Sequence, residues 1–237
     1  MSLAQARKDL RSFADAKKAA FFPSFFKTGK GEYGEGDTFL GVTVPDTRRV
    51  AKKHADLSFQ ELDALLASSW HEDRLLALVI LSDRFERANE SERKKIVDFY
   101  LAHTDRINNW DLVDTSASRI LGTYLLDKDI KVLDRLAKSK SLWERRIAMI
   151  ATLAFTVEGD PKPALRIAER LLDDDHDLMH KAVGWMLREV GKRCSEADLT
   201  GFLRKHMRDM PRTTLRYAIE RFPEGRRKGY LAKSREH

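Results

Sequence analysis

The chain has 237 residues, of which 42% are hydrophobic and 34% are charged. This length allows one large domain or an array of small repeated units, and it is enough to bury a core. The high charged fraction excludes a compact β-sandwich and is typical of helices with one solvated side. The formal net charge of +7 fits a polyanionic partner and a merely basic protein equally well.

Cysteine content and hydropathy set further bounds. Cys194 is the only cysteine, so neither an intramolecular disulfide nor a thiolate zinc site is expected. The first residues lack the long apolar core of a signal peptide, and no stretch approaches the length of a membrane span. We therefore expect a soluble cytoplasmic protein.

Almost the whole chain shows the period of helices, and no run alternates apolar and polar residues over a strand length. The expected breaks between helices are residues 28–37, Pro45, Asn89, residues 127–129, 158–163 and 173–177, and Pro211. The Gly-rich stretch 29–37 lacks the Lys-Ser/Thr ending of a phosphate-binding loop, and no strand precedes it. We interpret it as a flexible connection.

Five helical segments resemble one another: residues 68–81, 108–121, 141–155, 176–190 and 211–222. Several open with a bulky residue, continue with a basic residue and then place Ala among apolar residues. A degenerate repeat with two helices per unit predicts an all-α fold, a HEAT-like helical-repeat solenoid in one domain over residues 1–237. The second helix of each pair would line a concave face, which we expect to be basic.

The segment 110–124 predicts a helix with one apolar side. That side consists of Val113, Ala117, Ile120, Leu121 and Tyr124. At about 100° per residue, Trp110 falls within it and Asp114 falls at its border, where a carboxylate is partly desolvated and held rigid. Asp111 points away in the first turn. The helix dipole accounts for its charge, with Asn108 or Asn109 as the N-cap.

In the segment 143–155 the apolar side consists of Trp143, Ile147, Ile150, Ala151 and Ala154. Arg146 sits at the edge of this side and is placed to reach the concave face. Arg145 points almost opposite, and we expect it to be ordinary surface.

In the segment 178–190 the apolar side consists of Met179, Ala182, Val183, Met186, Leu187 and Val190. Trp185 lies on the other side, together with Lys181 and Arg188. A tryptophan between two cations suggests a surface for a nucleic-acid backbone. The alternative is that Trp185 packs against the preceding helix of a solenoid.

Other cations fall on the expected inner helices: Arg48, Lys52, Arg74, Arg119, Arg212 and Arg216. Each alone is a solvated charge, but a series of them would form a positive track for phosphates. His176 and His180 stand one turn apart within an acidic run. No third metal ligand is evident, and the run fits a helix start better, so we expect no metal.

Four motifs carry a resemblance to a known family: GVTVPDTRR (41–49), NNWDLVD (108–114), LWERRIA (142–148) and KAVGWMLRE (181–189). With these motifs in order over nearly the whole chain, the sequence resembles the AlkD-type DNA alkylation repair family, alkylpurine DNA glycosylases built from HEAT-like repeats. The resemblance implies an active site of Trp110, Asp114, Arg146 and Trp185.

The resemblance also implies residues that contact DNA. The family's arginines match Arg48 and Arg188, and a tyrosine that some members place against the lesion is replaced by Phe25. A lysine that some members carry after the third motif is replaced around Ala154. With the neighbouring cations, the candidate DNA-binding residues are Phe25, Arg48, Lys52, Lys181, Arg188 and Arg212.

The activity that the resemblance implies is hydrolysis of the N-glycosidic bond of positively charged N3- or N7-alkylated purines, 3-methyladenine and 7-methylguanine, in duplex DNA. Such a base leaves as a neutral molecule and needs no general acid. Asp114 could stabilise an oxocarbenium-like sugar and place a water. We therefore expect a base excision repair enzyme without metal or cofactor, a monomer in the bacterial cytosol or nucleoid.

Two other classes of protein remain open. A non-catalytic HEAT-repeat protein that binds damaged or branched DNA would show the same repeats and cations, but it gains nothing from the carboxylate of Asp114. A protein–protein scaffold would carry mixed charge or apolar anchors on its inner face. Trp185 beside Lys181 and Arg188 argues against the scaffold.

Overall fold

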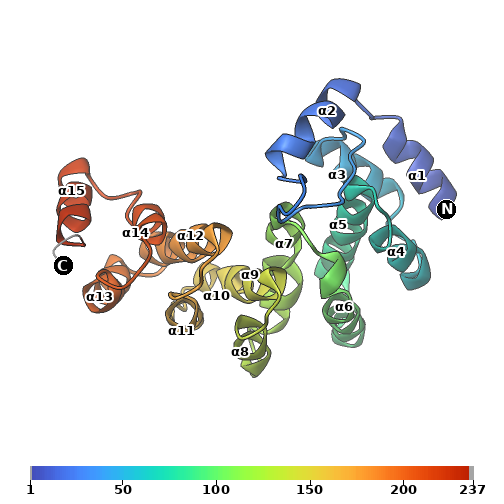
Figure 1. Ribbon diagram of the computed structural model, residues 1–237. Coiled ribbons are helices and arrows are strands. Elements are labelled where there is room, and N and C mark those ends of the chain that lie inside the picture. The colour runs from blue at the N-terminus through green and yellow to red at the C-terminus, as the bar shows by residue number, and fades with distance from the viewer. Residues whose placement is uncertain (1, 235–237) are drawn as a thin grey trace. The chain divides into compact units, whose positions relative to one another are not determined.

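The computed structural model describes residues 2–234, which fold into helices (Figure 1). These residues contain no β-strand, and Thr38 and Trp70 form an isolated β-bridge. The prediction of an all-α fold is confirmed. Within residues 2–234, each helix is too short or too polar to cross a bilayer.

Contacts divide the chain into two compact units, Met1–Ile120 and Leu121–His237. The first unit contains α1 (Leu3–Arg11), α2 (Ala16–Phe25), α3 (Val44–Lys53), α4 (Phe59–Leu66), α5 (His71–Arg87), α6 (Glu90–Ala102) and α7 (Trp110–Ser116). The second contains α8 (Lys131–Ala137), α9 (Leu142–Ala151), α10 (Leu153–Val157), α11 (Lys162–Arg170), α12 (Asp177–Arg193), α13 (Glu196–His206), α14 (Arg212–Ala218) and α15 (Glu224–Lys233). A single repeat domain over residues 1–237 stays a prediction.

Helix α5 is the centre of the first unit. Its residues from Leu75 to Ser82 are all buried, and the helix contacts α3, α4, α6 and α7 (Figure 1). A helix that is apolar all round has no solvated side, so neighbours must cover it on every face. The four charged or polar residues of its first turn, 71–74, are buried as well.

Helix α12 occupies the corresponding place in the second unit and contacts α9, α10, α11, α13 and α14. All six residues predicted for its apolar side are buried, so the predicted orientation of this helix is confirmed. Gly184 lets α14 approach closely, because a Cβ there would lie 2.5 Å from the Cβ of Tyr217 and 2.6 Å from the carbonyl oxygen of Thr214.

Two segments that we predicted as single helices are interrupted. Helix α7 ends at Ser116 and is followed by a π-helical turn, Ser118–Gly122. Helix α9 ends at Ala151, and α10 begins after Thr152. The predicted apolar side of 110–124 is nevertheless buried at Val113, Ala117, Ile120 and Leu121, whereas Tyr124 is half-buried.

The prediction that residues 29–37 are a flexible connection is wrong for part of the segment. The backbone N–H of Gly34 donates to the carbonyl of Lys27 at 2.9 Å, and Gly34 is buried. The side chain of Asp37 is buried in ion pairs with α5. These contacts fix the segment at both places, although most of its other residues are exposed.

Gly41 holds the loop after this segment against the start of α2. Its φ is +80°, and a Cβ would lie 2.2 Å from the carbonyl oxygen of Asp15. Gly31 has a φ of +78°, but a Cβ there would meet nothing within 4 Å. Both glycines have a positive φ, which favours glycine. They differ in that a Cβ would clash with backbone at Gly41 and would meet nothing at Gly31.

We expect Gly31→Ala to lower the free energy of unfolding by about 1 kcal/mol, the cost of a left-handed conformation for alanine. Gly41→Ala should lower it by at least about 2 kcal/mol more, because the added methyl group also clashes with backbone. Urea denaturation of both variants measures the difference. Equal losses would contradict the close packing of this loop on α2.

Candidate active site

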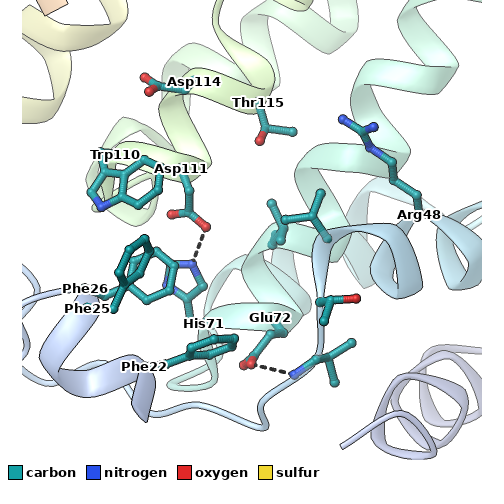
Figure 2. A pocket seen from close by; sticks show the side chains of 14 residues that line it. Phe22, Phe25, Phe26, Arg48, His71, Glu72, Trp110, Asp111, Asp114 and Thr115 are labelled. Carbon is teal, nitrogen blue, oxygen red and sulfur yellow. Dashed lines mark hydrogen bonds and ion pairs between the residues drawn. The ribbon is translucent and has the colours of Figure 1, made fainter. Parts of the chain in front are cut away.

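A pocket of about 470 Å³ lies in the first unit. It is lined by Phe22, Phe25, Phe26, Val42, Thr43, Val44, Arg48, His71, Glu72, Leu75, Trp110, Asp111, Asp114 and Thr115. Figure 2 shows these side chains arriving from α2, α3, α5 and α7 and from the loop before α3. The motifs around residues 41–49 and 108–114, far apart in the sequence, thus meet at one site.

Helix α7 brings Trp110 and Asp114 into this pocket. The side chain of Asn109 accepts the N–H of Trp110 at 2.8 Å, which confirms the predicted N-cap. Trp110 and Asp114 follow one turn apart on the same face, and both are half-buried. The partial desolvation predicted for Asp114 is confirmed.

Aromatic rings form one wall of the pocket. The ring of Phe26 stacks on Trp110, with centroids 5.4 Å apart and planes 20° apart, and on Phe39 at 5.1 Å and 17°. Phe25 meets Trp110 edge-on at 5.7 Å. Phe25 therefore lies beside Trp110 at the pocket, and its contact with a lesion stays a prediction. Stacked rings present negative faces, which attract cations.

A buried chain of charged residues, linked by ion pairs, packs against this wall. A nitrogen of Arg74 (Nη2) donates to Oδ1 of Asp37 at 2.6 Å. The other oxygen of Asp37 lies 2.9 Å from Nδ1 of His71, and Nε2 of His71 lies 2.8 Å from Oδ2 of Asp111. His71 is only 2% exposed, and its ring packs against both Phe26 and Phe39. Figure 2 shows its contact with Asp111 at the base of the pocket.

The two carboxylates keep His71 charged. Burial lowers the pKa of the ring, but the negative charge of Asp111 and the hydrogen bonds to Asp111 and Asp37 outweigh burial and raise the pKa to about 9. Burial raises the pKa of Asp37, and the hydrogen bond from His71 and the charge of Arg74 more than offset it and lower it. At neutral pH His71 therefore donates a proton from each ring nitrogen.

Glu72 holds the loop that completes the pocket. Its carboxylate accepts the backbone N–H groups of Leu40 at 3.0 Å, Gly41 at 2.8 Å and Val42 at 3.1 Å. These charge-assisted bonds to three backbone groups satisfy the buried carboxylate. Because Thr43 and Val44 follow this loop directly, Glu72 also fixes the edge of the pocket.

Two predictions about charges in the first unit are wrong. Asp111 is buried against His71, so the helix dipole is not a sufficient account of its charge. Arg74 is not a solvated charge but a buried one, paired with Asp37. Both errors arise from partners on other helices or loops, which a projection of one helix does not reveal.

Four residues of the site were not predicted from the sequence: His71, Glu72, Asp37 and Phe26. A signal for the first two was present in the stretch WHEDR (70–74), which precedes an entirely apolar helical run. Charged residues that start a helix with no solvated side must be buried and paired. Nothing in the sequence indicated which residues would be their partners.

The predicted DNA-binding residues of the first unit lie on or near the pocket. Arg48 is exposed and lines it, and Lys52 is exposed one turn further along α3. Arg119 is instead paired with Asp83 and Glu86.

The other two predicted active-site residues, Arg146 and Trp185, lie in the second unit. Arg146 is only 5% exposed, and its Nη1 donates to the carbonyl of Leu178 at 2.7 Å. Trp185 is half-buried on α12, beside Gly184. That these two residues act together with Trp110 and Asp114 stays a prediction.

Three predicted cations of the second unit, Lys181, Arg188 and Arg212, have partners within it. Lys181 pairs with Asp177 at 2.6 Å, and Arg188 pairs with Glu220. Arg212 is exposed and donates to the carbonyl of Leu231 at 3.2 Å. To contact a DNA phosphate, Lys181 would have to leave the carboxylate of Asp177, and Arg188 would have to leave that of Glu220.

Two further predictions concern the ends of helices in the second unit. Arg145 is not ordinary surface, because its Nε donates to Asp174 at 2.5 Å. His176 is the N-cap of α12 and accepts the N–H of Leu178 at 3.1 Å, while His180 bonds to the carbonyl of Asp174. The acidic run therefore serves a helix start, as predicted.

The chain is similar to known proteins both in sequence and in structure. A sequence model of the family described as "DNA alkylation repair enzyme" matches residues 6–222. The chain is similar to a solved structure, "Predicted DNA alkylation repair enzyme from Enterococcus faecalis", with a TM-score of 0.68 over 89% of this chain and 97% of that one. The two sequences are 15% identical, so this likeness shows the fold alone. No curated protein gives a significant match.

We expect the charge of His71 to make stability depend on pH. Its pKa is about 9 in the folded protein and about 6.5 in the unfolded chain, so its contribution is complete below pH 6.5 and is lost as the pH rises through 9. The loss should approach about 3 kcal/mol between pH 7 and pH 10 in urea denaturation.

His71→Gln is the matched control, because every other titrating group is retained. This variant should be less stable than wild type at pH 7 and should lose less stability between pH 7 and pH 10. The same loss in both proteins would show that the chain of charges does not hold His71 protonated.

Proposed function

We propose, because the chain belongs to the DNA alkylation repair enzyme family, that it is a DNA glycosylase. Its substrates would be positively charged N3- and N7-alkylated purines, such as 3-methyladenine and 7-methylguanine, in duplex DNA. The observation that carries this proposal is the carboxylate of Asp114, half-buried at a pocket whose wall includes Trp110, Phe25 and Phe26.

The pocket suits a cation with a flat apolar surface. Ring faces attract positive charge, and the effect grows where water is excluded. A carboxylate at the same pocket adds a direct Coulomb attraction. Asp111 contributes less, because His71 compensates its charge at 2.8 Å. We assign Asp114, which lines the pocket one turn from Trp110 on α7, to the ligand.

The pocket offers no obvious acid for the leaving base. His71 carries protons, but both ring nitrogens already donate to Asp37 and Asp111. An alkylated purine needs no such acid, because the cationic base departs as a neutral molecule when the C1′–N bond breaks. A neutral purine would leave as an anion and would react poorly. Discrimination by charge follows from this difference.

Asp114 has two roles in the proposed reaction. Its negative charge stabilises the oxocarbenium-like sugar that forms as the C1′–N bond breaks. The same carboxylate accepts a proton from the water that attacks C1′. Trp110, one turn earlier on α7, would pack against the deoxyribose and restrict it to the reactive position.

Arg146 and Trp185 enter the proposal through the family resemblance. A guanidinium that is 5% exposed offers little surface to a phosphate. We therefore assign Arg146 a positioning role: through the carbonyl of Leu178 it holds the first turn of α12, on which Trp185 stands. Trp185 would pack against the nucleotide.

The proposed setting is base excision repair in the cytoplasm by a monomer on duplex DNA. The alternative is a HEAT-repeat protein that binds damaged or branched DNA without cleaving it. A pure binder would tolerate loss of Asp114, and a glycosylase would not. Substitution of this one residue separates the two functions.

We expect Asp114→Asn to lose at least about 100-fold in the single-turnover rate of 7-methylguanine release, which corresponds to roughly 3 kcal/mol of transition-state stabilisation. Affinity for the same duplex should fall far less than the rate, because contacts to phosphates dominate DNA affinity and the amide keeps the size of the side chain. Base release by chromatography and binding by fluorescence anisotropy give the two values.

Two outcomes would contradict the proposal. Full excision by Asp114→Asn would remove the carboxylate from the mechanism. Binding of alkylated DNA by wild type without any release of base would favour the non-catalytic alternative.

Arg48 and Arg49 provide a matched pair for DNA binding. Arg48 lines the pocket, whereas Arg49 is paired with Asp46 at 3.0 Å and is not among its lining residues. We expect Arg48→Gln to weaken binding of damaged and normal duplexes alike and to lower the slope of log K against log salt by about 1. Equal effects of Arg48→Gln and Arg49→Gln would argue against a specific phosphate contact at the pocket.

A further inference from the structure

Helix α2 has an unusual surface. Its sequence, AKKAAFFPSF, is rich in apolar residues, yet it contains no buried residue. Phe21 is 58% exposed and Phe25 is 50% exposed, and Phe21 is the most exposed large hydrophobic residue within 2–234. Two exposed phenylalanines on one helix are unfavourable in water unless a partner covers them.

The two rings form a row that leads into the pocket. Phe21 stacks on Phe25 with centroids 6.0 Å apart and planes 29° apart. Phe25 in turn meets Trp110 at 5.7 Å. Figure 2 shows Phe25 next to Trp110 and Phe26 at the α2 side of the pocket. The aromatic wall of the pocket thus continues outward over the surface of α2.

Cations lie on the same face of the helix. Lys17 and Lys18 are four and three residues before Phe21, so they occupy the turn beside it. Both are exposed, and Lys18 is paired with Asp15 at 3.2 Å near the surface. An exposed pair of this kind contributes little and is readily exchanged for another anion.

We propose that Lys17, Lys18, Phe21 and Phe25 form a second DNA contact, named here the α2 surface. The rings of Phe21 and Phe25 pack against the sugars and bases next to the nucleotide in the pocket, and the two lysines contact its flanking phosphates. Aromatic rings beside cations are the arrangement with which proteins hold nucleic-acid strands regardless of sequence. This inference rests on the proposed function for the identity of the nucleotide in the pocket.

Charge and continuity select DNA over other occupants. The lysines complement a phosphate backbone, and the row of rings begins at the pocket that would hold the damaged nucleotide. A second copy of the chain would bring the same lysines against each other. A ten-residue helix also offers less area than the roughly 800 Å² per partner of a stable protein interface.

The experiment measures binding of a labelled duplex with a central tetrahydrofuran abasic site by fluorescence anisotropy at several salt concentrations. All variants are made in the Asp114→Asn background, so that binding is independent of excision. We expect Phe21→Ala to weaken binding about tenfold with an unchanged salt slope. The double variant Lys17→Gln/Lys18→Gln should lower the salt slope by about 2.

Val157→Ala is the matched control, because Val157 is an apolar side chain that is 53% exposed in the second unit. Its affinity should equal that of the background protein. Urea denaturation of each variant checks that the fold is retained. Wild-type affinity in both the Phe21 and the lysine variants would overturn the inference.

Two further measurements test the other occupants and separate this inference from the proposed function. Dissociation of a dimer by Phe21→Ala in sedimentation, or loss of binding to phosphatidylglycerol vesicles with DNA affinity unchanged, would overturn it. If no protein releases methylated base but the α2 variants still weaken DNA binding, the inference stands and the glycosylase proposal fails. If wild type releases methylated base and the α2 variants bind DNA with unchanged affinity, the glycosylase proposal stands and the inference about the α2 surface fails.

Discussion

The first unit depends on four buried polar residues in the first turn of α5. His71 pairs with Asp111 of α7 and Asp37 of the loop after α2, and Glu72 accepts the N–H groups of the loop before α3. Arg74 pairs with Asp37, and the buried Asp73 pairs with arginines of α1. Because a buried charge without a partner costs several kcal/mol, these pairings allow one arrangement of the surrounding segments and exclude others.

The same pairings determine the chemistry of the pocket. His71 neutralises Asp111 and cannot protonate a ligand, since both ring nitrogens are engaged. Asp114, one turn away on α7, lines the pocket with Trp110, and we assign it to positive charge. Stabilisation of the oxocarbenium-like sugar by a fixed charge requires such a rigid frame, because the charge must already be in place when the transition state forms.

The parts of this account that could be predicted from the sequence are those set by local periodicity. The buried side of α12 follows from a constant turn angle over one continuous helix, and the partial burial of Asp114 follows from its place near the start of α7. The π-helical turn beyond Ser116 is not indicated by that pattern, although the apolar residues predicted there, Ala117, Ile120 and Leu121, are buried. The pairing of His71 with Asp111 joins residues 40 positions apart, and no local pattern reports such a contact. The resemblance supplied Trp110 and Asp114, but it could not show how α5 holds them.

The central claim is that Asp114 stabilises positive charge on the deoxyribose. Duplexes that carry a pyrrolidine abasic analogue, cationic at neutral pH, and a neutral tetrahydrofuran analogue differ in that charge and little else. We expect wild type to bind the cationic duplex at least about tenfold more tightly, roughly 1.4 kcal/mol, and Asp114→Asn to lose most of this preference. Equal binding by wild type, or a preference that persists undiminished in Asp114→Asn, would contradict this claim.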